Sequence, residues 1–426
     1  MADRSKLAGA LAVFVIAFFP ALRSEAAGAS FEILPGQVNL LGVEASHRLL
    51  ALRIDGEYAG AEQEAQFSSD RPGVVAIGAD GIAVAKGDGK ATITAVGADG
   101  QRASAVVTVR GFEGGREWSF RNDVMPVISK AGCNTGGCHG ALAGKGGFAL
   151  SLDGYAPGDD YHTITRGARG RRVELAAPAR SLLLTKPTAA TKHKGGRRLD
   201  PNSRDYRILA EWIVAGAAPP RADDPTLERI EMIPARSFLG PGDSQQLVVR
   251  AFYSDGREED VTQWAKFTSA DETVATVDSK TGRVRVVGHG EGAVRAWFSS
   301  RIVMARVTSP YPNEIPEAVF AKAQRRNFID DAVLDQLRRL RLKPSPRAGD
   351  SEFIRRVYMD TIGVLPSVEE TRAFLEDGRG AKAARDELID GLLERPEYVD
   401  YWAYRWSDLF LVAGRYLRPD ALKSYF

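Results

Sequence analysis

Both cysteines of this 426-residue chain stand close together, and a histidine directly follows the second. The stretch reads AGCNTGGCHGALAGKGG (131–147) and contains Cys133, Cys138 and His139. Three chemistries use such residues: covalent attachment of a c-type haem, a small disulfide, and a metal site. The usual haem motif has two residues between its cysteines, whereas four separate them here. Gly136 and Gly137 would let the longer loop bulge away from the ring, so the spacing does not exclude haem, and the disulfide and the metal site stay open beside it.

A second axial ligand for such an iron has to come from further along the chain. His193, in TKHKGGRRLDP, is the leading candidate. The weaker candidates are His162, Met125 and Met232. The cations expected to pair with haem propionates are Arg197 and Arg198, with Lys192 and Lys194 beside them. His139 and His193 could instead join the two cysteines in a Cys2His2 zinc site.

Length, charge and the N-terminus indicate an exported protein of several domains. At roughly 100–200 residues per domain, 426 residues predict more than one. The net charge of +2 points to no polyanionic partner, so nucleic acid is not expected. Residues 1–29 have the layout of a secretory signal peptide, with an uncleaved anchor as the alternative. We therefore expect the chain in the periplasm or outside the cell, and not as an integral multi-span membrane protein.

Two regions, 30–112 and 226–310, predict all-β sandwiches. Short apolar alternations are separated by glycine and aspartate turns in both. The regions also resemble each other: FSSDRPGVVAIGADGIAVAKGDGKATITAV aligns with FTSADETVATVDSKTGRVRVVGHGEGAVRAWF. The shared pattern resembles the bacterial immunoglobulin-like domain of group 2, which implies a surface protein. His47 and His289 fall in these regions and are expected at the surface or in turns.

The segment between the sandwiches, residues 115–225, predicts helices around an irregular, glycine-rich and basic middle. Phe120, Val124 and Ile128 share one helical face, and a second helix begins after a possible cap at Ser203 and ends at Gly216. The segment resembles the planctomycete-type cytochrome c domain, on the strength of VMPVISKAGCNTGGCHGALAGKGGF, SLLLTKPT, HKGGRRL and SRDYRILAEWIVAGA. That resemblance implies haem attachment at Cys133 and Cys138 with His139 as proximal ligand. The Met-Pro-Pro segment that often supplies the distal ligand in relatives is missing, and the segment around His193 stands in its place.

Residues 325–426 predict an all-helical C-terminal segment. RRVYMDTIGVLPSVEETRAFL and YWAYRWSDLFLV resemble the helical domain of unknown function that accompanies such cytochrome domains. The domain continues further in those relatives, so we expect this copy to be incomplete. The segment shows no Ser-His-Asp set, phosphate loop or paired carboxylates, and an enzyme is therefore the weakest functional hypothesis.

The expected architecture is a multi-domain chain in which two immunoglobulin-like sandwiches flank an α-helical cytochrome c-like domain, followed by an all-α segment. The leading functional hypothesis is an exported c-type cytochrome-like protein that transfers single electrons to an unidentified redox partner. The alternative is a cell-surface adhesion or carbohydrate-binding scaffold with a disulfide in place of haem, whose ligand would be a cell-surface component or a polysaccharide.

Overall fold

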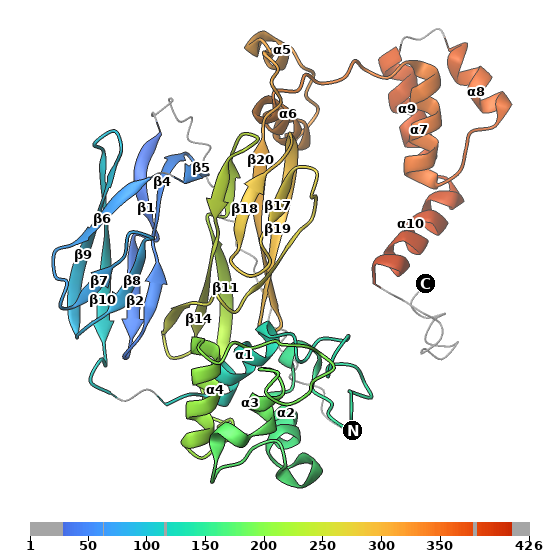
Figure 1. Cartoon of the computed structure of the whole chain (residues 1–426). Coiled ribbons are helices and arrows are strands. Elements are labelled where there is room, and N and C mark those ends of the chain that lie inside the picture. Colours follow the sequence, from blue (N-terminus) through green and yellow to red (C-terminus); the bar gives the residue numbers. More distant parts are fainter. Residues whose placement is uncertain (1–28, 63, 115–116, 378–380, 411–426) are drawn as a thin grey trace, which may run out of the picture. The chain divides into compact units, whose positions relative to one another are not determined.

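The computed structural model describes residues 29–62, 64–114, 117–377 and 381–410 (Figure 1). The expected signal peptide, residues 1–29, lies almost wholly outside the described residues. The chain divides into two compact units, one up to Leu342 and one from Lys343 onward. None of the helices in the part of the chain that the structure describes is long and apolar enough to cross a membrane.

The first sandwich occupies residues 30–110. Its strands are β1 (Ser30–Leu34), β2 (Gln37–Leu41), β3 (Ser46–Arg48), β4 (Leu50–Asp55), β5 (Tyr58–Glu62), β6 (Ala65–Ser69), β7 (Val75–Ile77), β8 (Ile82–Ala85), β9 (Gly89–Gly97) and β10 (Arg102–Arg110). They pair in the orders β1-β4-β5, β2-β10-β9-β6 and β3-β8-β7. Alternate residues of β9 and β10, such as Ile93 and Val107, are fully buried, as the period of two in the sequence predicts.

The second sandwich repeats this pattern about 200 residues later. Its strands are β11 (Leu227–Ile233), β12 (Arg236–Phe238), β13 (Ser244–Gln246), β14 (Val248–Tyr253), β15 (Glu258–Asp260), β16 (Lys266–Ser269), β17 (Ala275–Val277), β18 (Arg283–Val286), β19 (Gly290–Phe298) and β20 (Arg301–Ser309). The orders β11-β14-β15, β12-β20-β19-β16 and β13-β18-β17 match those of the first sandwich strand for strand. The internal repeat predicted from the sequence is thereby confirmed in the fold.

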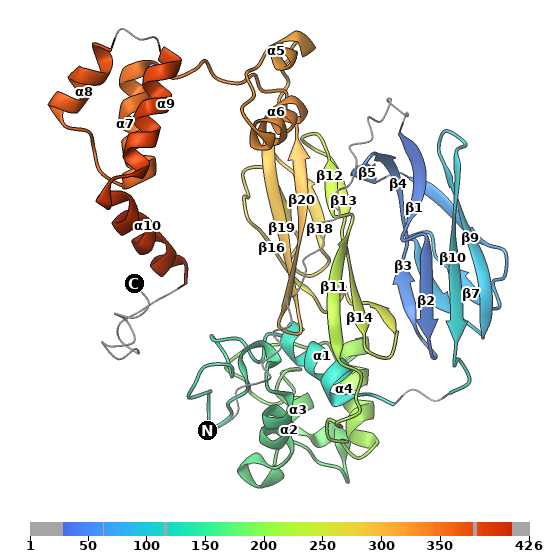
Figure 2. The same ribbon diagram turned by 180° about the vertical axis from the view of Figure 1, so that it is seen from behind.

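The two sandwiches meet in a reciprocal way (Figure 2). Strand β5 pairs in parallel with β12, at Ala59 and Ser237, and also contacts β13. In return β15, the counterpart of β5, contacts β2 and β3, the counterparts of β12 and β13. Matching surfaces thus face each other, as in an isologous dimer built from one chain. The apolar seam between them contains Leu50, Leu52, Ala59 and Val248, with Leu34, Ile54 and Ile233 packed against them.

The segment between the sandwiches is a helical module. It contains the π-helical turn η1 (Phe120–Val124), α1 (Met125–Lys130), α2 (Pro157–Thr165), α3 (Leu182–Thr185) and α4 (Arg204–Val214), with 3-10 turns η2 (Leu152–Gly154), η3 (Gly167–Gly170) and η4 (Pro178–Arg180). The Ser203 hydroxyl accepts a hydrogen bond from the Tyr206 amide and caps α4, as predicted. Trp212, Ile208 and Phe120 form a core that continues into the second sandwich.

Polar contacts also fasten the module to the second sandwich. The Lys130 ammonium donates to the carbonyls of Ala265, Ser279 and Lys280. The Trp264 indole N–H donates to the Asp205 carboxylate over 3.0 Å. Because an ammonium with three carbonyl partners and a shared apolar core act together, the module and the second sandwich should unfold as one unit.

The remaining helices are α5 (Glu317–Ala321) and α6 (Phe328–Leu340) in the first unit, and α7 (Asp350–Ile362), α8 (Val368–Leu375), α9 (Ala381–Leu393) and α10 (Pro396–Leu409) in the second. A capping box of Asn327 and Asp330 begins α6. The second unit packs around Ile354, Tyr358 and Leu392. The all-helical character predicted for this end of the chain is confirmed over its described residues.

Candidate functional site

The cysteine-histidine loop folds back tightly on itself. The His139 amide donates to the Cys133 carbonyl over 2.8 Å, and the Cys138 amide donates to the Thr135 carbonyl over 2.9 Å. A side chain on Gly140 would lie 2.0 Å from the Asn134 carbonyl oxygen, so only glycine fits there. The loop therefore holds the two thiols and the imidazole next to each other in a fixed backbone.

Two histidines from distant loops meet beside it. The ring centroids of His139 and His193 are 6.4 Å apart and their planes differ by 13°. Each Nδ1 donates to a backbone carbonyl, that of Phe148 over 3.0 Å for His139 and that of Gly196 over 2.9 Å for His193. A carbonyl oxygen can only accept, so Nδ1 is the donor in both rings and Nε2 is the nitrogen left for another partner. Burial lowers the pKa of His139, which favours the neutral form.

The two cysteines are free thiols in the structure. Burial raises the pKa of the Cys133 thiol to about 11, with the neighbouring Cys138 as a smaller cause. A thiol with that pKa stays protonated at neutral pH and is a poor nucleophile. The disulfide expected in the alternative interpretation is not formed here, although both thiols lie in one short loop.

A buried arginine that the sequence did not single out holds these loops together. The Arg172 guanidinium donates to the carbonyls of Thr163, Gly167 and Gly147, over 3.0, 2.9 and 2.9 Å. It also lies over the Phe148 ring, 4.4 Å from the centroid. Arg172 thus connects α2, η3 and the loop next to His139. In the sequence it looks like one more surface cation of GARGRRVE, because its partners are backbone carbonyls, which no residue type marks in advance.

Of the other residues predicted for the site, the two arginines lie in the His193 loop, and the weaker ligand candidates lie in helices or in the second sandwich. Arg198 donates from Nε to the Gly195 carbonyl, and Arg197 forms an exposed ion pair with Asp200. Both therefore lie in the His193 loop, as expected. Of the weaker candidates, His162 is exposed on α2, Met125 is buried in α1, and Met232 is buried in β11 of the second sandwich.

His47 is a correction to the sequence interpretation, which placed it at the surface or in a turn. It lies in β3 and is only 1% exposed. Its Nδ1 donates to the Arg48 carbonyl over 2.7 Å, and its Nε2 has no hydrogen-bond partner. Burial lowers its pKa, while Asp260 on the opposite sandwich acts against that shift. Its short strand contains no apolar residue, so no local pattern in the sequence predicts its burial.

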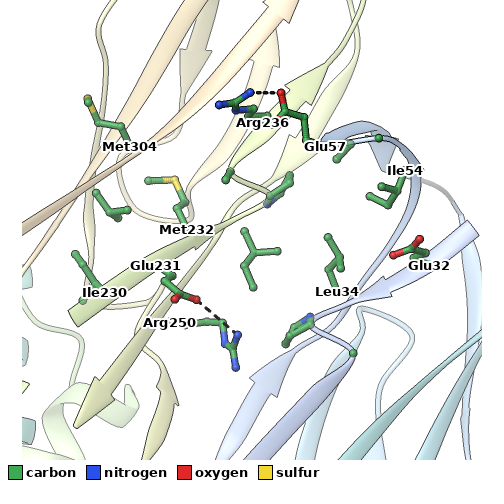
Figure 3. Close-up of a pocket in the computed structure, with 18 residues that line it drawn as sticks. Glu32, Leu34, Ile54, Glu57, Ile230, Glu231, Met232, Arg236, Arg250 and Met304 are labelled. Atoms are coloured by element: carbon green, nitrogen blue, oxygen red, sulfur yellow. Dashed lines mark hydrogen bonds and ion pairs between the residues drawn. The ribbon is translucent and has the colours of Figure 1, made fainter. Parts of the chain in front are cut away.

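A cavity lies at the seam between the sandwiches, and its lining residues are far along the chain from the cysteines (Figure 3). It has a volume of about 570 Å³ and is lined by apolar side chains such as Leu34, Met232 and Met304. Ion pairs of Glu57 with Arg236 and of Glu231 with Arg250 flank it. Cys133, Cys138, His139, His193, Arg197 and Arg198 do not line it.

Comparison with protein families identifies two regions. Residues 228–298 match the bacterial Ig-like domain of group 2. Residues 328–420 match a protein family of unknown function, DUF1549. These matches support the immunoglobulin-like and C-terminal resemblances seen in the sequence. Neither family is a cytochrome c. The segment between the sandwiches is helical, as predicted, but these matches do not show it to be a cytochrome c domain.

Comparison with solved structures finds distant likenesses, and no curated protein matches the sequence. Domains 5–6 of the S-layer protein SbsC are 11% identical, with a TM-score of 0.27, covering 66% of this chain and 99% of that one. Domains 1–6 of SbsC are 12% identical, with a TM-score of 0.18 and 68% of this chain covered, and this chain spans 29% of their length. BT4661, a SusE-like surface located polysaccharide binding protein from the Bacteroides thetaiotaomicron heparin utilisation locus, is 10% identical, with a TM-score of 0.14 over 67% of this chain and 35% of that one. Likeness this weak carries no argument about function.

The leading functional hypothesis, an electron-transferring c-type cytochrome, is wrong on these findings. The matched families are an immunoglobulin-like domain and a domain of unknown function. Among the described residues, no group of three or more His, Cys, Asp or Glu side chains could hold a metal ion. None of these observations tests whether haem c binds at Cys133, Cys138, His139, His193, Arg197 and Arg198. Haem binding there stays a prediction from the sequence. The findings favour the alternative, a surface scaffold.

Proposed function

We propose that the chain is a binding scaffold of the bacterial cell surface, in which paired immunoglobulin-like sandwiches carry the helical module. The observation that supports this most is the group 2 bacterial Ig-like domain at residues 228–298, together with its strand-for-strand repeat in residues 30–110. The signal-peptide pattern of residues 1–29 adds an export route. Such a scaffold needs no catalytic group, only a rigid frame that displays loops.

The seam between the sandwiches supplies that rigidity. Its central side chains, Leu52 and Val248, are fully buried, and the β5–β12 pairing extends one sheet through both sandwiches. The bidentate ion pair of Arg207 on α4 with Glu44 adds a link from the helical module to the first sandwich. The module is therefore tied to both sandwiches, and its loops are displayed from a fixed base.

Surface exposure in the native cell tests this proposal. The full chain carries a C-terminal epitope, and intact cells are treated with a protease that cannot enter them. We expect the epitope signal to disappear from intact cells while a cytoplasmic control protein stays protected. Protection of the chain until the cells are lysed, together with its recovery in the cytoplasmic fraction, would refute the proposal.

A further inference from the structure

One stretch of the helical module carries far more positive charge than the rest of the chain. Between Arg166 and Arg198 there are ten Lys and Arg residues and a single carboxylate, Glu174, which gives a local charge of +9. Since the whole chain has +2, the remaining residues sum to −7. The near-neutral net charge of the whole chain therefore combines a strongly basic segment with an acidic remainder.

Most of these cations are exposed and uncompensated. The exposed ones, here called the basic surface, are Arg166, Arg169, Arg171, Arg180, Lys192, Lys194, Arg197 and Arg198. Arg197 pairs with Asp200, and the others form no ion pair within the described part of the chain. Lys186 is half-buried and donates to the Lys192 carbonyl, while Arg172 is the buried anchor described above. So many exposed and unpaired cations within one segment of 33 residues indicate an anionic partner.

Backbone hydrogen bonds hold the loops and turns that carry the basic surface against each other. The Arg198 amide donates to the Pro187 carbonyl over 2.7 Å, and the Leu183 amide donates to the Arg172 carbonyl over 3.0 Å. Arg172 in turn donates to the loop before Phe148. Because these segments are fixed to one another, binding orders little additional backbone, and several charges can meet one ligand at once.

The side chains of the basic surface fit carboxylate or sulfate groups. Six of the eight are arginines, whose planar guanidinium forms two parallel hydrogen bonds with such groups. The module offers no stacking platform for nucleic-acid bases, since among its described aromatic residues only Tyr155 is exposed. A polysaccharide with one acidic group per sugar would present its charges in a row to several arginines.

We propose that the basic surface binds acidic polysaccharide of the cell envelope or its surroundings. This inference rests on the proposed surface location, and it names the ligand class of that scaffold. The immunoglobulin-like sandwiches supply the frame, and the loops between η3 and α4 supply the contacts.

The test uses the full chain and two purified probes, polygalacturonate and dextran sulfate, with uncharged dextran as the blank. The variant Arg169→Gln/Arg171→Gln/Arg180→Gln removes three exposed charges whose side chains make no hydrogen bond in the structure. Its matched control, Arg110→Gln/Arg285→Gln/Arg295→Gln, removes three exposed arginines from β-strands of the sandwiches. We expect about tenfold weaker binding of both probes by the first variant, unchanged binding by the control, and a weaker salt dependence in the first variant only.

Several outcomes would overturn the inference. They are no binding of either probe at physiological salt, equal losses in the two variants, or tighter binding of single-stranded DNA or of vesicles of anionic phospholipid than of the polysaccharides. These results leave the surface location untouched if the protease experiment succeeds. Conversely, a chain retained in the cytoplasm refutes the proposed function even where the purified protein binds polygalacturonate.

Discussion

Replacement of Arg172 by alanine is the sharpest perturbation of the loops that carry the histidine pair and the basic surface. Arg172 is 6% exposed, and no carboxylate among the described residues forms an ion pair with it. Its guanidinium satisfies the carbonyls of Thr163, Gly167 and Gly147 and covers the Phe148 ring. Alanine would leave these carbonyls without their charged donor and would uncover the ring.

The size of the loss follows from these contacts. A hydrogen bond from a charged donor contributes about 1.5–3 kcal/mol, and a cation over an aromatic ring about 0.5–2 kcal/mol. The three bonds share one side chain and water replaces some of them, so the sum is not additive. We expect a loss of about 3–5 kcal/mol. If the module unfolds together with the second sandwich, this lowers the Tm of that transition by about 6–20 °C.

Calorimetry of the full chain measures the effect, because separate units give separate transitions. Arg172→Lys is the matched control: it keeps the charge but replaces the planar fork by a single ammonium, and it should recover part of the lost stability. Hydrogen exchange at the Leu183 amide, which donates to the Arg172 carbonyl, reports on the loops directly. An Arg172→Ala protein with an unchanged Tm and undiminished protection at Leu183 would show that the guanidinium does not hold the loops.

Three further predictions concern the cysteine loop and the seam. With a pKa of about 11, Cys133 should react with iodoacetamide at pH 8 at least about tenfold more slowly than glutathione, as mass spectrometry of the peptide can show; an equal rate would contradict its burial. Leu52→Ala should cost about 2–5 kcal/mol, because Leu52 is fully buried beside Val248; a change under 1 kcal/mol in urea unfolding would mean that the seam is not packed. Burial lowers the pKa of His47, so around and below pH 6.5 the unfolded chain binds a proton there more readily than the folded chain. The free energy of unfolding should therefore fall as the pH drops from 7 to 5. His47→Phe should reduce that fall, and an identical pH dependence in the variant would rule out His47 as its source.

Local patterns in the sequence were sufficient for many strands of both sandwiches. Alternation of apolar residues with glycine turns marks strands such as β9 and β19, and the Ser203 cap marks the start of α4. The seam was beyond such reasoning. Pairing of β5 with β12 joins residues about 180 positions apart, and nothing local to Ala59 or Ser237 specifies the partner.

The candidate site shows the same division. Cys133, Cys138 and His139 are neighbours in the sequence, and the His193 ring lies 6.4 Å from that of His139, while its predicted role as a distal haem ligand stays a prediction. Spacing alone could not decide what chemistry the loop performs, because a cysteine pair followed by histidine suits several. The role of Arg172 was hidden for another reason: a charged side chain is expected in solvent unless its partners are known, and its partners are backbone carbonyls.

The net charge of the whole chain says little about the electrostatic field at any one surface. A net charge of +2 predicted no polyanionic partner, yet the field at a surface depends on charges within about 8 Å at physiological salt. The acidic residues that balance the composition lie mostly outside residues 166–198, and screening prevents distant carboxylates from cancelling the basic surface. Binding of acidic polysaccharide should therefore weaken as salt increases, even though the chain as a whole is nearly neutral. Affinity for polygalacturonate that is the same at 50 mM and 500 mM salt would show that these arginines do not make the contact.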